Sequence, residues 1–124
     1  MSSAKLDGPG TQKLKTLEDA LQLLANIHGV VERMAVEVNA ERPIGVMGLQ
    51  LKRASAPLQG LLKGQFGIIA DQVSVLILAA GRGGRDAIRL RALREHVAQI
   101  RTAIDINVHK VKEQHAEVGG VDRG

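Results

Sequence analysis

The sequence predicts an all-α fold, an up-down-up antiparallel bundle of three long helices. Apolar residues recur at alternating intervals of three and four in three long segments, and this spacing places them on one face of a helix. Breaks at residues 41–45 and 81–84, both rich in glycine or proline, separate the segments. Because short connections make consecutive helices antiparallel neighbours, we expect one slender bundle.

The first helix is predicted to begin near Thr11 or Thr16, either of which can cap it, and to run to about Ala40. Two apolar stripes lie side by side in it and form a face wide enough to touch two other helices. Pro43 ends the helix, because the residue before a proline is pushed out of the helical region. The first stripe contains Leu14, Leu17, Leu21, Leu24, His28, Val31, Ala35 and Val38, and the second contains Ala20, Leu23, Ile27, Val30 and Met34.

The second helix is predicted over roughly residues 46–80, with an interruption at Pro57. Proline inside a helix removes one backbone hydrogen bond and clashes with the preceding turn, so we expect a kink, or two helices meeting, near Pro57. Three small residues at intervals of four form a flat ridge, which we interpret as tight core packing. The ridge contains Ala56, Gly60 and Gly64, and the apolar stripes contain Met47, Leu51, Ala54, Leu58 and Leu61, then Leu62, Phe66, Ile69, Val73, Leu76 and Ala80.

The third helix is predicted to begin after Gly84 and to end near Val118, where two glycines follow. Asn107 is the polar member of its stripe, and a buried amide there can fix the register between helices. We expect residues 1–10 and 119–124 to be flexible tails around one helical domain, residues 11–118. The stripe contains Leu90, Leu93, Val97, Ile100, Ile104, Asn107, Val111 and Val118.

Composition narrows the classes of function. The chain has 124 residues, a net charge of +4, no cysteine, and Phe66 as its one aromatic residue, so the core must be aliphatic. Proteins that bind single-stranded nucleic acid usually stack bases on aromatic side chains, which disfavours that class. The absence of cysteine excludes disulfides and thiolate metal sites. No secretory signal or apolar run of about 20 residues is present, so we expect a soluble cytoplasmic protein that does not use a membrane.

The segment from Val75 to Arg85, VLILAAGRGGR, resembles the glycine-rich signature of sugar-nucleotide and related nucleotidyltransferases. That resemblance implies an apolar strand running into a phosphate-binding loop, with an arginine on the phosphates. The chain departs from the family because helical periodicity surrounds the segment and the lysine that usually follows is missing. No catalytic triad or carboxylate pair accompanies it, so we expect neither an enzyme nor a cofactor.

Positive charge gathers around this glycine-rich break and the start of the third helix. Converging backbone amides and a helix start both favour an anion. In a three-helix bundle the first and third helices start at the same end, which adds two lysines to the arginines. The candidate anion- or nucleic-acid-binding residues are Lys13, Lys15, Arg82, Arg85, Arg89, Arg91 and Arg94. The alternative is that these are solvated surface charges, partly balanced by neighbouring acids.

His28 lies in the first apolar stripe with Gly29 beside it. We interpret it as a partly buried packing residue; the alternative is a phosphotransfer histidine, which would have to be exposed beside a small residue. His28 with Glu32, and His109 with Glu113, have the four-residue spacing of metal ligands. The two pairs lie too far apart along the helices to share an ion, so we expect no metal.

These observations predict a non-enzymatic interaction or scaffold protein. A three-helix rod with such wide faces leaves apolar surface exposed, so we expect a homodimer that closes the core, or another protein partner. The first alternative is a small basic protein that binds an acidic protein, an anion or a nucleic-acid backbone through the arginine-rich turn. The second alternative is a histidine-phosphotransfer protein that uses His28.

Overall fold

The computed structural model describes residues 6–116, which form four helices. The predicted all-α class is confirmed, whereas the predicted architecture of three long helices is wrong. The predicted tail at 119–124 lies outside the described residues, as do residues 1–5 and 117–118. The helices are α1 (Gly8–Asn39), α2 (Met47–Leu62), α3 (Gly67–Ala80) and α4 (Asp86–Gln114).

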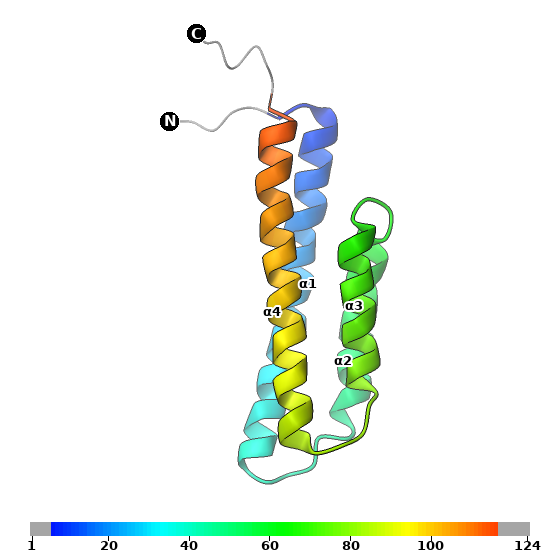
Figure 1. Cartoon of the computed structure of the whole chain (residues 1–124), viewed down its shortest axis with the longest axis vertical. Helices are drawn as coiled ribbons and strands as arrows, with labels where there is room; N and C mark the ends of the chain where they lie inside the picture. Colours follow the sequence, from blue (N-terminus) through cyan, green and yellow to red (C-terminus); the bar gives the residue numbers. More distant parts are fainter. Residues whose placement is uncertain (1–5, 117–124) are drawn as a thin grey trace.

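The two long helices, α1 and α4, form an antiparallel pair, and the shorter α2 and α3 form a hairpin that packs along part of it (Figure 1). At 1.5 Å per residue the long helices extend for about 45 Å and the short ones for about 20–25 Å. The hairpin therefore covers about half of the long pair. At the covered end, four helices surround one core, and at the other end α1 and α4 continue as two helices (Figure 1).

The second predicted helix splits at residues 63–66, and Pro57 lies inside α2 on its exposed side. The apolar stripe continues across the break, but the chain reverses there, so both parts bury their stripes against the same long pair. Leu58 and Leu76 are both fully buried. Glycine in a helix costs about 1 kcal/mol relative to alanine, so Gly64 and Gly67 weaken a continuous helix at this point. The side chains of Gln59 and Ser74 are hydrogen-bonded across the resulting hairpin.

Helix α1 begins at Gly8, three residues before the earlier of the two predicted starts. Asp7 caps it by accepting a hydrogen bond from the Gly10 backbone N–H at 2.7 Å, and Pro9 occupies the first turn. Thr16 does not cap the helix, because its hydroxyl donates to the Gln12 carbonyl one turn earlier. The expected ending by Pro43 agrees with the end of α1 at Asn39.

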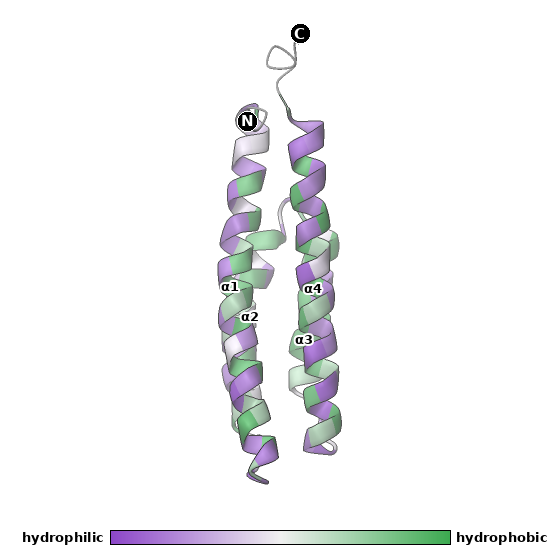
Figure 2. Ribbon diagram, turned by 90° about the vertical axis from the view of Figure 1, so that its left-hand side faces the viewer, coloured by the Kyte–Doolittle hydropathy of each residue, from purple (hydrophilic) through white to green (hydrophobic). Residues whose placement is uncertain are grey.

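The apolar stripes form the core. Hydrophilic and hydrophobic residues alternate along α1 and α4, as amphipathic helices require (Figure 2). The second stripe of α1 begins at Ala20, and Thr16 and Gln12 precede it at the same spacing. This stripe therefore becomes polar near the end of the hairpin, where Gln12 and Thr16 line a hollow with Leu61 of α2. Asn107 is half-buried, and its amide donates to the Ala103 carbonyl of its own helix at 2.8 Å.

Candidate interaction surfaces

The structure separates the predicted basic residues into two groups. Because the chain forms four helices, its first and last helices start at opposite ends of the molecule (Figure 1). Lys13 and Lys15, near the start of α1, therefore lie at the end where the described chain begins and finishes. Arg82, Arg85 and the start of α4 lie at the other end. The expectation of one pole that joins the lysines to the arginines is wrong, since it depended on an odd number of helices.

Arg89 is held inside the fold. Its side chain is only 13% exposed, and Nη2 donates to the Ala80 carbonyl at the C-terminal end of α3, at 3.4 Å. A cation is favoured at this end of a helix, where carbonyl groups lack partners. The Arg89 Nη1 atom also lies 3.5 Å from an Asp86 carboxylate oxygen. Arg89 therefore joins α3 to α4, with most of its side chain buried between them.

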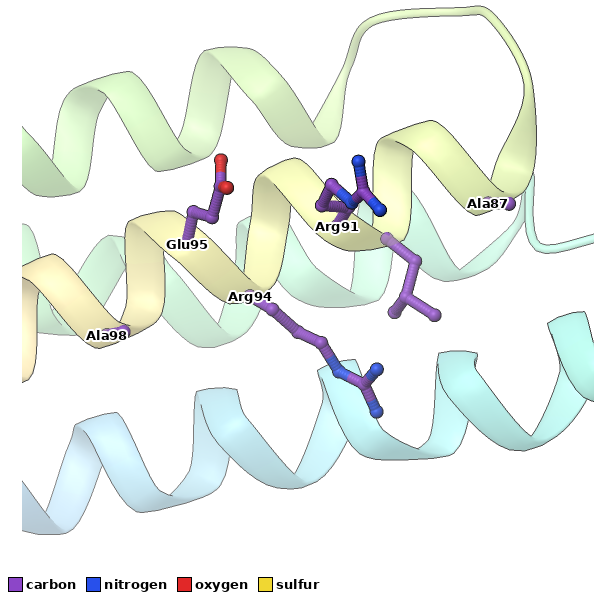
Figure 3. A pocket seen from close by; sticks show the side chains of 6 residues that line it. Ala87, Arg91, Arg94, Glu95 and Ala98 are labelled. Carbon is purple, nitrogen blue, oxygen red and sulfur yellow. The ribbon is translucent and has the colours of Figure 1, made fainter.

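Arg94 joins the two long helices. It extends from α4 toward α1, whereas Arg91 and Glu95 point away from that helix (Figure 3). The Arg94 Nε and Nη2 atoms donate to the two carboxylate oxygens of Glu32 at 3.1 and 2.8 Å. This fork geometry matches guanidinium to carboxylate, and the hydrogen bond from Arg94 lowers the pKa of Glu32 below its ordinary value. Of the arginines predicted from the sequence, Arg82, Arg85 and Arg91 are exposed and make no ion pair within residues 6–116.

His28 is exposed, so the interpretation of a partly buried packing residue is wrong. Its side chain is 55% exposed, and Nε2 lies 3.8 Å from a Glu32 oxygen. It lines a shallow hollow between α1 and α4 together with Arg94 and Arg101. The described part of the chain contains no group of three or more histidines and carboxylates placed to hold a metal ion.

A cluster of polar side chains joins the two ends of the described chain. The His115 Nδ1 atom lies 3.2 Å from the Asp7 carboxylate, and its Nε2 atom lies 3.2 Å from Lys13 Nζ. The Nδ1–H group can donate to the Asp7 carboxylate. The Asp7 backbone N–H also donates to the His115 carbonyl. Gly10 packs against the His115 ring, and a Cβ atom there would collide with it. Lys13 thus has a structural partner.

The outer face of α3 is apolar. Ile68, Val75 and Leu78 share it, with exposed side chains at 81%, 47% and 64%. The opposite side of the same helix is fully in the core, where Val73 and Leu76 are buried. Asp71 is the one charged residue of α3. We call Ile68, Asp71, Val75 and Leu78 the α3 face.

The outer face of α2 combines apolar and basic residues. Val46 and Leu49, 84% and 53% exposed, line a shallow hollow with Arg53, and spacings of three and four residues put all three on one side of the helix. The predicted core ridge is wrong, because Ala56, Gly60 and Gly64 are exposed; a Cβ atom on either glycine would meet nothing within 4 Å. We call Val46, Leu49, Lys52 and Arg53 the α2 face.

Sequence reasoning missed both faces, although each has a signal. Residues 67–80 contain large apolar side chains outside the buried stripe as well as along it. No acidic residue occurs between Glu41 and Asp71, a segment that contains four cations. Both signals concern the exposed side of the helix, whereas the apolar stripes mark only buried positions.

No family model matches the chain, and searches of curated proteins and of solved structures found no similar protein. In the part of the chain that the structure describes, none of the helices combines the length and the apolar character needed to cross a membrane. The surfaces themselves are therefore the basis for a proposal about function.

Proposed function

We propose that this protein is a non-enzymatic interaction module that self-associates as a dimer through the α3 face. One observation carries the proposal: the exposed side of α3 bears three large apolar side chains, Ile68, Val75 and Leu78, in addition to the apolar side that the hairpin buries. Exposed apolar side chains that lie next to one another often mark an interaction surface. We therefore expect another protein surface to bury the apolar side chains of the α3 face.

The charge on the α3 face favours a second copy of the chain as that cover. In a two-fold dimer each patch meets the same patch, so charges of one sign on a patch face each other. A nearly uncharged face avoids this repulsion, and Asp71 is the one charge on α3. Burial of aliphatic surface provides a favourable term of about 25 cal/mol per Å².

The position of the acid also suits a second copy. If two α3 helices pack antiparallel about Val75, Asp71 of one copy lies level with position 79 of the other. Arg82 then follows less than one turn further along the second copy, and this arginine is exposed and makes no ion pair within residues 6–116. By symmetry the dimer contains two such pairs. The dimer thus places opposite charges at both ends of an apolar centre.

Light scattering on the purified chain tests the proposal. We expect a dimer at micromolar concentration, and the substitution Val75→Lys should weaken dimerisation at least tenfold, because it places two ammonium groups in the apolar centre. Val36 on α1 is similarly exposed and lies on another helix, so Val36→Lys is the matched control and should dimerise like the wild type. A wild-type monomer at about 100 µM, or equal effects of the two substitutions, would contradict the proposal; a dissociation constant of about 1 µM corresponds to 8 kcal/mol.

A second candidate function, histidine phosphotransfer, is supported by the exposure of His28. The imidazole lies open to solvent beside Gly29, where an added Cβ atom would meet only the Arg33 guanidinium at 3.9 Å. A partner domain therefore has room to approach. The test is acid-labile phosphate after incubation with a low-molecular-weight acyl phosphate. It should be lost in His28→Gln and kept in His109→Gln, and equal labelling of the two variants would exclude this function.

A further inference from the structure

We infer that the α2 face is a docking surface for an acidic amphipathic helix of a partner protein. This inference does not depend on the dimer, because the α2 face consists of different residues from the α3 face. Val46 is the most exposed large apolar residue among those described, and Leu49 lies one turn away on the same side of the helix. Together they form an apolar contact that a partner side chain can cover.

Two cations of the same helix lie near this apolar contact, and Arg53 lines the same hollow as Val46 and Leu49. Lys52 and Arg53 are both exposed and take part in no ion pair within residues 6–116. The Lys52 side chain lies over Gly81 at the end of α3, where a Cβ atom would come within 2.9 Å of Nζ. Helix α2 contains no acidic residue that could balance these two cations. A partner segment that carries carboxylates therefore complements the face.

The N-terminal end of α2 adds a partial positive charge beside these cations. Val46 provides no side-chain cap, and the first turn contains no acid. The N-terminal end of a helix carries a partial positive charge, which favours a nearby carboxylate by about 0.3–1 kcal/mol. Cations, helix end and apolar residues thus lie together at the beginning of one helix. They select a ligand that is both acidic and apolar.

The composition of the face distinguishes this partner from two others. A second copy is disfavoured, since a two-fold contact would oppose Lys52 and Arg53 with the same cations. A nucleic-acid backbone offers phosphates to the cations but no apolar groups for Val46 and Leu49. An amphipathic helix offers both, with apolar anchors at intervals of three and four residues. Beyond Leu49 the exposed positions Ala56 and Gly60 carry almost no side chain, so a partner helix can lie close.

Fluorescence anisotropy with two labelled peptides tests the inference. The first is a helical peptide of about 18 residues, or five turns, with leucines at helical spacing and glutamates on its flanks. The second replaces every glutamate with lysine. The protein is the full chain, measured as wild type and as the Val75→Lys variant, so that failure of the dimer does not affect the result.

We expect the acidic peptide to bind saturably and the lysine peptide not to bind. The pair of substitutions Lys52→Glu and Arg53→Glu should weaken binding at least tenfold, as should Val46→Glu. Arg101→Glu is the matched control, because Arg101 is exposed on α4 and lines another hollow, and it should bind like the wild type. Equal binding of both peptides, or wild-type affinity in the Lys52 and Arg53 variant, would overturn the inference. Tighter binding of duplex DNA or anionic lipid vesicles to the same residues would also overturn it.

Discussion

Helices α2 and α3 form one hairpin and bury similar inner faces, but their outer faces differ. The inner faces contain fully buried leucines, such as Leu58 in α2 and Leu76 in α3. The outer face of α2 carries two cations beside apolar residues, whereas that of α3 is apolar with one acid. The inner faces hold the hairpin on the long pair, and we propose that the outer faces determine which partner each helix binds.

If the two proposals hold, the difference in charge separates self-association from the binding of another protein. A two-fold interface brings each charge close to its own copy, so it suits the nearly neutral α3 face and not the cationic α2 face. Electrostatic complementarity acts mainly on specificity and association rate, while buried apolar area supplies the favourable free energy. The two faces of the hairpin thus combine these terms in different proportions.

The largest expected effect tests the shared role of the inner faces. Leu58→Ala and Leu76→Ala should each lower the free energy of unfolding by about 3 kcal/mol, because each leaves a cavity in the core. Leu78→Ala, on the outer face of α3, should lower it by less than about 1 kcal/mol in a monomeric background. Denaturant unfolding measures all three. A small effect of Leu58→Ala beside a large one of Leu76→Ala would show that α2 contributes less to the core than α3.

The next effect concerns Pro57 of α2, which has no counterpart in α3. Pro57 lies inside this helix and is exposed, so replacing it by alanine restores a backbone hydrogen bond without removing core contacts. We expect Pro57→Ala to raise the free energy of unfolding by about 1–2 kcal/mol after allowing for the greater freedom of the unfolded chain. A fall in stability, measured by thermal unfolding, would show that the ring packs against a partner or stabilises the bend.

The next prediction concerns the proposed ion pair between Asp71 of one copy and Arg82 of a second copy. Asp71→Arg and Arg82→Asp should each weaken the dimer about tenfold, or 1.4 kcal/mol, because each places like charges together at two positions. The double variant restores opposite charges and should recover most of the wild-type affinity. Sedimentation equilibrium measures the dissociation constants. Additive weakening in the double variant would refute the antiparallel register.

The smallest expected effect is the pH dependence of stability that carboxylates on the long helix pair produce. A hydrogen bond from Arg94 lowers the pKa of Glu32, and a hydrogen bond from the Gly10 backbone N–H lowers the pKa of Asp7. A carboxylate whose pKa is lower in the folded state than in the unfolded state stabilises the fold at pH values above its unfolded-state pKa. That contribution is lost as the pH falls through the folded value, below about 4.5 for Glu32.

We expect the melting temperature to fall when the pH is lowered below this value. The substitution Glu32→Gln should make the melting temperature depend less on pH. The change in stability at neutral pH should stay below about 1 kcal/mol, because the pair is partly exposed. Glu95→Gln is the control, since Glu95 is exposed and points away from α1 in Figure 3. An unchanged pH profile in Glu32→Gln would show that the Arg94 pair contributes nothing.

Much of the fold could be predicted from the sequence, because the apolar stripes mark the buried side of each helix. The position of the second break could not be predicted in the same way. A continuous helix and a hairpin both continue the stripe through Leu62 and Phe66, so periodicity alone does not distinguish them. Pro57 was a local signal of a break, but tertiary packing keeps it inside α2. Adding one helix also reversed α4 relative to α1 and moved Lys13 away from the arginines.

The candidate surfaces were less predictable than the core. Side chains on one stripe do not show how far the neighbouring helix covers it, and His28 is exposed although it lies at a stripe position. Long-range pairs such as Arg94 with Glu32 depend on the register of α4 against α1, which no local pattern contains. The α3 face is recognisable only when the outer positions are read together with the inner ones.

Disulfide cross-linking of a cysteine at position 75 tests directly whether α3 of one copy packs against α3 of another. The chain contains no cysteine, so Val75→Cys introduces one thiol at the centre of the proposed antiparallel contact, and Val36→Cys gives a matched thiol on α1. Under mild oxidation the account predicts rapid formation of a covalent dimer from Val75→Cys and only slow formation from Val36→Cys. Equal rates for the two variants, or a Val75→Cys protein that stays monomeric, would contradict it.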